Sequence, residues 1–201
     1  MSLAEKSRSI PEGFEPPSFH APVDVAAVIR QMPPGATAKG IFYRALVREG
    51  QSVGQHFDGF GPYRDFKDYP LTEACRLLEE VGRRLYPDET LRSAIRRLGW
   101  VIFPTLLGTM PGRVVFGALG NDMAAVVANA HKGFEISVND GRCEVLRVAP
   151  GLGHLRLTGF HLFPDCFLVG VFEGAFAHYG IEPEIHVRST GRYDCEYLFF
   201  W

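Results

Sequence analysis

The chain has 201 residues, 46% of them hydrophobic and 12% aromatic, which is enough to bury one sizeable core. Its 21 lysines and arginines against 23 aspartates and glutamates give a formal charge of -2. This balance excludes a general electrostatic attraction for nucleic acid or for an anionic membrane surface, so neither is an expected partner. No run of 18 apolar residues could span a bilayer, and the first residues lack the apolar core of a signal peptide.

Prolines dominate the first 22 residues. Four of them stand among polar residues, a pattern typical of a surface arm rather than of a folded element. We predict that residues 1–22 form such an arm and that residues 23–201 form a single domain.

Helices are expected in the first half of this domain. Asp24 can cap a short helix, and Thr37 is predicted to begin a second one. A third helix, with a single apolar face, begins at Pro70 or Thr72. Asp88 is predicted to cap a fourth, so that the last two form a helical hairpin.

The segment from residue 51 to residue 70 is a loop rich in glycine and aromatic side chains. Loops of this length commonly carry function or pack as compact Ω-loops, so we expect a ligand to bind here. The candidate ligand-binding residues, in this loop and elsewhere, are His56, Phe57, Phe60, Tyr63, Trp100 and His131.

The pattern changes after the next predicted helix, which Asn121 can cap and which ends at His131. Apolar and polar residues alternate over residues 134–138, which predicts the first strand of an antiparallel meander over residues 134–158. Asp140-Gly141 supplies a tight-turn signal between its first two strands.

One buried helix is predicted from Pro164 to Tyr179. Pro164 suits a first helical turn, and Gly180 can adopt the left-handed conformation that ends a helix. Both sides of this helix are apolar, and Gly170 and Gly174 allow a neighbouring element of the chain to approach closely.

The last segment, residues 185–201, alternates again and predicts a second hairpin. Helices, then antiparallel strands, one crossing helix and a final hairpin define an α+β fold rather than an alternating parallel α/β fold. Apolar residues occupy both faces of the last strand as well as both sides of the long helix. We therefore predict a homodimer formed through that helix or through the edge of the terminal hairpin.

Three sequence motifs resemble an uncharacterised family of paralogues found in myxobacteria. They are DYPL at Asp68–Leu71, RLG at Arg97–Gly99, and FPDCFLVGVFEGAFAHYGI from Phe163 onward. The resemblance covers roughly residues 24–201, and the family carries no established activity. More remotely, the order of elements is similar to the fold shared by haem-based nitric-oxide sensors, 4-vinyl-reductase-type small-ligand domains and the TRAPP transport subunits. That likeness is one of topology, so any function drawn from it is an analogy.

His131 ends the segment LGNDMAAVVANAH, which resembles the helix on which the haem sensors place their iron-binding histidine. Those sensors hold the haem propionates with a Tyr-x-Ser-x-Arg pattern in the following strand, but this chain has LRLTG at Leu155–Gly159. The alternative role of His131 is to interact with the C-terminal carbonyls of its own helix. Our main interpretation therefore has no cofactor, and haem is the alternative.

Catalytic and metal-binding motifs are absent from the sequence. The histidines show neither HExxH nor paired Cys/His spacing, and the four cysteines are widely spaced. No nucleophile elbow is present, and GFGPYR at Gly59–Arg64 matches no phosphate-binding loop. We expect reduced cysteines, a cytoplasmic protein, no catalytic residue and no metal site. The predicted function is a non-enzymatic signalling or adaptor module that binds a small apolar ligand or a protein partner; the alternative is a haem-type gas sensor with His131 as the iron ligand.

Overall fold

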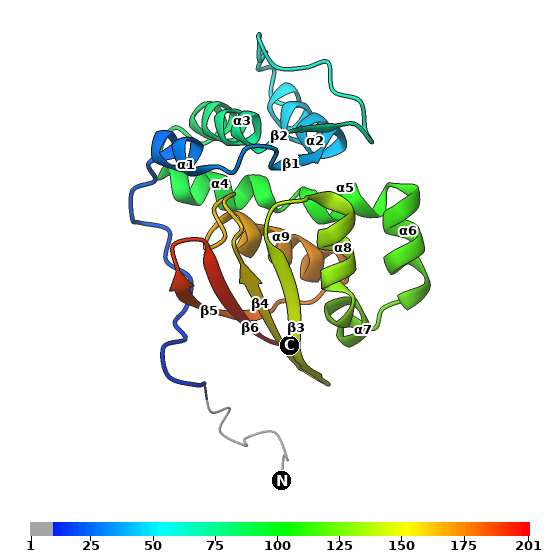
Figure 1. The fold of residues 1–201 in the computed structure, drawn as a ribbon. Coiled ribbons are helices and arrows are strands. Elements are labelled where there is room, and N and C mark those ends of the chain that lie inside the picture. Colours follow the sequence, from blue (N-terminus) through cyan, green and yellow to red (C-terminus); the bar gives the residue numbers. More distant parts are fainter. Residues whose placement is uncertain (1–9) are drawn as a thin grey trace.

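The computed structural model describes residues 10–201, so residues 1–9 of the predicted arm lie outside the described residues. Helices cover one face and one end of a four-stranded antiparallel sheet (Figure 1). This arrangement confirms the predicted α+β fold.

The first half of the chain is helical, with one small two-stranded sheet. Its helices are α1 (Val25–Gln31), α2 (Gly40–Gln51), α3 (Leu71–Leu85) and α4 (Leu91–Gly99). The strands β1 (Thr37–Lys39) and β2 (Asp68–Pro70) pair antiparallel just before α2 and α3. Asp24 caps α1 as predicted, because its Oδ1 accepts a hydrogen bond from the backbone N–H of Ala27 at 2.8 Å.

Two predicted helix starts in this half are wrong. Thr37 begins β1 rather than α2, because its backbone N–H donates to Oδ1 of Asn139 at 2.6 Å and its carbonyl accepts from the Asn139 N–H. These bonds hold the segment extended, and the helix starts only at Gly40. Thr90, not Asp88, caps α4 by accepting from the N–H of Ser93 at 3.2 Å.

Shorter helices connect this half to the sheet. They are α5 (Ile102–Leu107), α6 (Met110–Phe116), the 3-10 turn η1 (Gly117–Leu119), α7 (Met123–Ala128) and α8 (Ala130–Ser137). Within residues 10–201, no single helix is both long and apolar enough to cross a bilayer. One pair, Leu91–Leu107 with Met110–Phe116, reaches that length and composition only together, across a bend of 86°.

The prediction of a strand over residues 134–138 is wrong, since most of this segment belongs to α8. Its alternation of apolar residues also fits a helix, because Ala130, Phe134 and Ser137 recur at the spacing of one helical face. The Oγ of Ser137 donates to the carbonyl of Gly133 at 2.6 Å, as a residue inside a helix can. Asp140-Gly141 therefore precedes the sheet instead of forming a hairpin turn.

The sheet has the order β3-β4-β6-β5, and all three of its pairings are antiparallel. Its strands are β3 (Arg142–Ala149), β4 (Leu152–Thr158), β5 (Glu184–Gly191) and β6 (Asp194–Phe200). The terminal hairpin of β5 and β6 is confirmed, with Val187 opposite Tyr197. Because side chains alternate between faces, Tyr197 and Phe199 point to the helices while Leu198 and Phe200 point away from them.

The long helix α9 (Phe167–His178) crosses the inner face of the sheet. It begins three residues later than predicted, and the carbonyl of Pro164 instead accepts a hydrogen bond from the hydroxyl of Tyr197 at 2.7 Å. Phe172 packs on Tyr197 and on Phe199, with 4.9 Å between ring centroids in both pairs. The opposite side of α9 packs against α4, so the helix lies between the sheet and the helical half.

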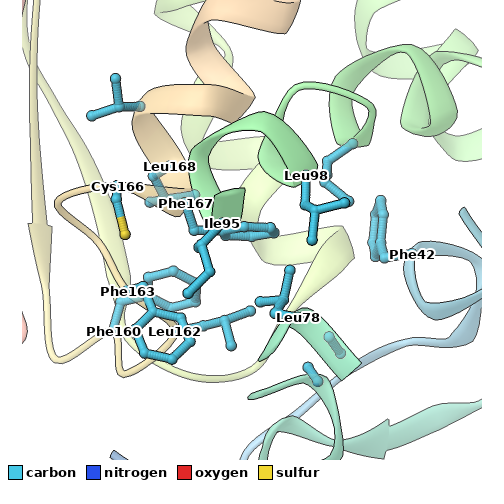
Figure 2. Packing of buried hydrophobic residues seen from close by; sticks show 14 of the residues in the cluster. Phe42, Leu78, Ile95, Leu98, Phe160, Leu162, Phe163, Cys166, Phe167 and Leu168 are labelled. Carbon is cyan, nitrogen blue, oxygen red and sulfur yellow. The ribbon is translucent and has the colours of Figure 1, made fainter. Parts of the chain in front are cut away.

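The core is continuous from the helical half to α9. Figure 2 shows side chains from α3, α4, α9 and the turn before α9 in one cluster. Leu78, Ile95 and Leu98 have no measurable exposure, and Leu162 and Phe163 of the turn extend toward them. This packing holds the start of α9 against α4.

Candidate functional site

An interior cavity of about 140 Å³ lies between the helical half and the inner face of the sheet. Its volume is close to the roughly 150 Å³ of an engineered cavity in another protein that stays dry and binds benzene or xenon. Much of its wall comes from apolar side chains of α2, α5, α6, α7, α9 and the sheet. Examples are Phe42, Leu46, Phe103, Leu106, Phe116, Met123, Val127, Leu155, Phe176 and Phe199.

Polar side chains in this wall already use their hydrogen-bonding groups inside the protein. The Tyr43 hydroxyl lies 2.9 Å from the carbonyls of both Tyr69 and Pro70. The Tyr197 and Ser137 hydroxyls donate to backbone carbonyls, and Arg156 donates to Glu196 at 3.0 Å. Each of these four groups already makes at least one hydrogen bond inside the protein, and the rest of the wall is mostly apolar, so the wall favours apolar molecules.

Cys143 adds a thiol to the wall. Burial raises the pKa of this thiol to about 12, and the nearby carboxylates of Glu135 and Glu144 add to the effect. The thiol is therefore neutral at physiological pH and behaves as a small apolar group with little nucleophilic character.

The helices α7 and α8 place their apolar faces against the cavity. Asp122, rather than the predicted Asn121, caps α7 by accepting from the N–H of Ala125 at 3.1 Å. Gly133 of α8 lies against the ring of Phe116, and a Cβ at this glycine would come within 2.8 Å of the ring. Phe116 can therefore pack on the α8 backbone only because residue 133 has no side chain.

Within residues 10–201, the cavity wall contains none of the six sequence-predicted ligand-binding residues. His56 is exposed, and its carbonyl accepts from Arg84 at 2.7 Å. The buried ring of Phe57 packs against Gly50 of α2. Phe60 is half-buried at the edge of the core.

Tyr63 anchors the same loop to the helical half. Its hydroxyl donates to Oε1 of Glu73 at 2.6 Å, and its ring centroid lies 5.0 Å from that of Tyr43 and 4.9 Å from that of Tyr69. Apart from the exposed Phe66, the aromatic residues of the loop thus pack on one another or on the helices, as in a compact Ω-loop. Ligand binding at these residues remains a prediction.

Trp100 lies in a second hollow, of about 500 Å³, at the surface between α2 and α5. Its side chain is 46% exposed. Charged side chains of both signs line this hollow, among them Arg44, which pairs with Asp65. The structure therefore separates Trp100 from both the loop aromatics and the interior cavity.

His131 is half-buried at the start of α8, and its Nδ1 is buried without a hydrogen-bond partner among residues 10–201. It is on a different face of α8 from Ala130, Gly133 and Phe134, which line the cavity. Across the described part of the chain, no three His, Cys, Asp or Glu side chains converge as a possible metal-binding group.

Haem does not fit the residues present. A porphyrin is far larger than benzene, and no histidine of the described residues lines the cavity. The ring of Phe116 covers the cavity side of α8 at Gly133. In LRLTG, where the sensors carry their propionate clamp, Leu155 and Leu157 point into the core and Arg156 pairs with Glu196.

The cavity has no contiguous sequence motif, because its wall comes from many elements. The local signal that could have indicated part of it is the helical spacing of Met123, Val126 and Val127, followed by Ala130 and Phe134. The strand assigned to residues 134–138 obscured that signal.

Solved structures with a similar fold include H-NOX proteins. The Fe(II) unliganded H-NOX protein from K. algicida has a TM-score of 0.62 and 13% identity, over 81% of this chain and 95% of its own. The S. oneidensis protein in the Fe(II)NO state has a TM-score of 0.59 and 16% identity, over 80% and 97%. The Shewanella oneidensis domain solved by NMR in the Fe(II)CO state has a TM-score of 0.61 and 18% identity, over 81% and 97%. At such identities the likeness shows the fold alone.

Among curated protein sequences, nothing matches this chain. The family model described as a protein of unknown function, DUF2378, matches residues 31–201. The expected uncharacterised family and its remote similarity to the fold of the nitric-oxide sensors are thus both confirmed. The chain belongs to the DUF2378 family.

Proposed function

We propose that this chain is a non-enzymatic cytoplasmic signalling or adaptor module that binds a small apolar molecule in its interior cavity. The observation that carries the proposal is the cavity wall, which is apolar and whose polar side chains are bonded within the protein. A ligand can gain free energy there by burying apolar surface, at about 25 cal/mol per Å². The volume favours a molecule near the size of benzene.

The fold supports a ligand-binding role by analogy. The S. oneidensis H-NOX proteins of similar fold were solved in Fe(II)NO and Fe(II)CO ligation states. In this chain the residues around the cavity suit a smaller guest than a porphyrin, so we propose that the apolar molecule binds directly to protein side chains.

Two methionines allow a direct test by NMR. Met123 lines the cavity, whereas Met110 of α6 is 71% exposed and lies outside its wall. With ¹³C-labelled methionine methyl groups, titration with benzene or indole should shift the Met123 resonance saturably and leave that of Met110 in place. An unchanged Met123 resonance at the solubility limit of both compounds would refute the proposal.

Two alanines provide matched variants. Ala130 and Ala128 are both half-buried and lie two residues apart, but only Ala130 lines the cavity. At a ligand concentration about 100 times the Kd, benzene should raise the unfolding free energy by about 2.7 kcal/mol. This gain should persist in Ala128→Leu and disappear in Ala130→Leu, whose longer side chain takes up the space. Equal gains in the two variants would place the ligand elsewhere.

Self-association stays a prediction. The glycine side of α9 packs against α4, so that side of the long helix is covered within the chain. At the edge of the terminal hairpin the arm bridges β5 only at Val187, so a homodimer through that edge stays a prediction. Light scattering after size-exclusion chromatography decides the question, since the chain mass is 22.4 kDa and a dimer has twice that value.

A further inference from the structure

Part of the N-terminal arm lies along β5, the outer strand of the sheet (Figure 1). Glu15 and Val187 exchange two backbone hydrogen bonds, of 3.1 Å from the Glu15 N–H and 2.8 Å from the Val187 N–H. This is an antiparallel bridge, so the arm takes the place of a fifth strand at a single position.

Phe14, next to this bridge, fills a pocket on the outer face of the sheet. Its side chain is 7% exposed and packs on Leu198 and Phe200 in a cluster separate from the main core. The guanidinium of Arg188 lies 4.6 Å from the Phe14 ring centroid, and His154 meets the ring edge-on at 5.5 Å. The pocket thus combines an apolar floor with a cation over the ring, which suits an aromatic side chain.

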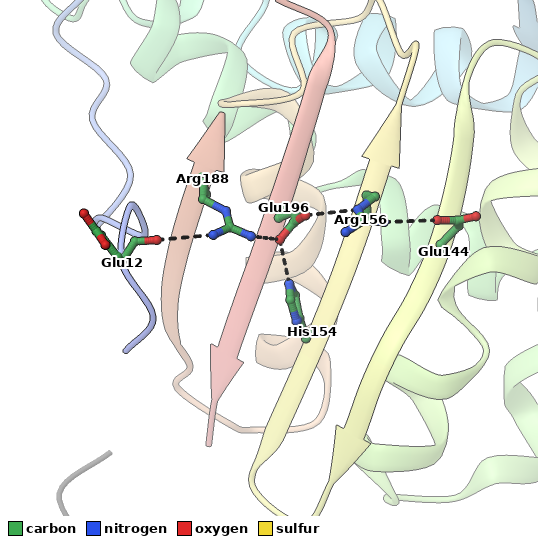
Figure 3. A network of polar contacts seen from close by, with 6 residues as sticks. All are labelled: Glu12, Glu144, His154, Arg156, Arg188 and Glu196. Carbon is green, nitrogen blue, oxygen red and sulfur yellow. Dashed lines mark hydrogen bonds and ion pairs between the residues drawn. The ribbon is translucent and has the colours of Figure 1, made fainter. Parts of the chain in front are cut away.

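A buried carboxylate holds this pocket in shape (Figure 3). Glu196 is 3% exposed and accepts hydrogen bonds from Arg188 at 2.6 Å and from Arg156 at 3.0 Å, and His154 Nε2 lies 3.0 Å from its Oε2. A second amino group of Arg188 donates to the carbonyl of Glu12 at 3.2 Å. Arg188 is therefore positioned by the sheet and at the same time contacts both the backbone and the ring of the arm.

The arm uses only a fraction of this edge. Hydrogen-bonding direction alternates along an antiparallel strand, so the backbone N–H and C=O of Ile185 and Ser189 point to the same side as those of Val187. Among residues 10–201, neither has a backbone partner on that side. In the register set by Glu15, Pro17 lies opposite Ile185 and has no N–H to donate.

Pairing of the arm with β5 also stops on the other side of the bridge, at Ser189. Gly13 would lie opposite Ser189, but it has φ +82° and belongs to a turn in which the Phe14 N–H donates to the Pro11 carbonyl at 3.3 Å. A turn on one side and Pro17 on the other thus restrict the arm to one bridge. A segment that stays extended through these positions would pair with all three residues of the edge.

We propose that the β5 edge and the Phe14 pocket form a docking site for an extended segment of a partner protein, which the arm of this chain occupies in its absence. The segment adds a strand to β5 and places an aromatic side chain in the pocket, with no proline at the position that pairs with Ile185. This mode of recognition obtains affinity from backbone hydrogen bonds and specificity from the side-chain pocket. The arm, tethered at high effective concentration, is a competitor that only such a segment displaces.

The docking surface belongs to the part of the chain that the family model matches, whereas the arm precedes it. The residues of the site, from His154 to Phe200, lie within residues 31–201, and Phe14 and Glu15 lie outside. The site therefore lies within the matched residues, and the arm residues that occupy it lie outside them.

A labelled peptide with the sequence of residues 10–19, IPEGFEPPSF, tests the site in trans by fluorescence anisotropy. The full-length Phe14→Ala chain should bind this peptide at least tenfold more tightly than the unmodified chain, whose own Phe14 competes. Phe66→Ala is the matched control, because Phe66 is 62% exposed and lies outside the site. The Phe66→Ala chain should bind the peptide with the same affinity as the unmodified chain.

Changes in the peptide leave the folding of the chain unaffected. A peptide with Phe14→Ala should lose binding, and one with Pro16→Thr and Pro17→Val should bind about tenfold more tightly, because it regains an N–H opposite Ile185. Equal binding of the alanine peptide, or no binding of any peptide to a folded Phe14→Ala chain, overturns the proposal.

The unmodified chain supplies a second readout that does not depend on the Phe14 variant. Saturation with the proline-free peptide should slow hydrogen exchange at the amides of Ile185 and Ser189, which have no backbone partner at the sheet edge among residues 10–201. Unchanged exchange at both amides contradicts strand addition. If the unmodified chain forms a dimer that the peptide dissociates, the occupant is the arm of a second copy, and the assignment to a partner protein is overturned.

Discussion

Gly174 of α9 faces the backbone carbonyl of Trp100 at the end of α4 so closely that a Cβ at residue 174 would overlap the carbonyl oxygen. Gly170, one turn earlier, meets the carbonyl of Arg96 in the same way. The guanidinium of Arg96 pairs with Glu173 at 2.6 Å beside this contact. The crossing of α4 and α9 is therefore set by the absence of side chains along one stripe of α9.

Replacing Gly174 with alanine should lower the unfolding free energy by about 2 kcal/mol. Alanine gains about 1 kcal/mol in helix propensity. The added methyl, however, meets backbone that cannot turn away, so overpacking should cost about 3 kcal/mol, the upper end of its usual range. Urea denaturation measures the balance. Gly117→Ala is the control, because a Cβ there meets only the Cβ of Arg113, at 3.7 Å. If both variants are equally stable, α4 and α9 are not in tight contact.

Glu196 should make stability depend on pH. Burial alone would raise the pKa of this carboxyl, but hydrogen bonds from Arg188, His154 and Arg156 outweigh burial and lower the pKa below its ordinary value. A lowered pKa means that the stabilisation is complete above the unfolded-state pKa of about 4.3 and is lost as the pH falls through the folded-state pKa.

The variant Glu196→Gln isolates this contribution. It should be less stable than the unmodified chain by roughly 1–3 kcal/mol at pH 7, because hydrogen bonds to a charged group are lost. The difference should begin to shrink below about pH 4, where the carboxyl of the unfolded chain becomes protonated, and it should be smallest below the lowered folded-state pKa, where the native carboxyl is protonated too. Thermal melts of both chains between pH 3 and pH 7 measure it, and a difference that stays constant over this range contradicts the assignment.

The long helix and the terminal hairpin were predictable because each has a local signal. Pro164 and Gly180 bracket the helix, and residues 185–199 alternate over enough positions to establish the period of a strand. Residues 134–138 are too few for this. Their alternation fits both a strand and the inner face of α8. The helix is the structure observed, and in it Gly133 packs against the ring of Phe116.

The interior cavity could not be predicted from the sequence. The loop of residues 51–70 was the expected place for a ligand, but its aromatic residues Phe57 and Tyr63 pack within the loop and on α2 and α3. The cavity wall comes from residues as far apart as Phe42 and Phe199. Such a site has no contiguous motif, because tertiary packing alone brings its residues together.

Variants of two adjacent residues, Asn121 and Asp122, can show which of them caps α7. Asp122→Ala should cost about 1 kcal/mol, since the backbone N–H of Ala125 loses its partner at 3.1 Å. Asn121→Ala, at the exposed position where the sequence suggested the cap, should change the unfolding free energy by less than about 0.5 kcal/mol. Urea denaturation of the two variants provides the comparison. A larger loss for Asn121→Ala would restore the cap inferred from the sequence.

An absorbance spectrum distinguishes the haem alternative from the proposal of an apolar ligand. His131 lies at the start of α8 with its Nδ1 unpaired among the described residues, yet the cavity wall contains no histidine and the ring of Phe116 covers Gly133. Protein mixed with haem and then desalted should therefore show no Soret band that shifts on addition of nitric oxide. A band that does shift, that is lost in His131→Ala and that persists in His178→Ala would mean that α6 and α8 separate to admit the porphyrin. His178 is the suitable control because it is an exposed histidine at the end of another helix, α9, and any haem held non-specifically by surface histidines would respond to its removal as well.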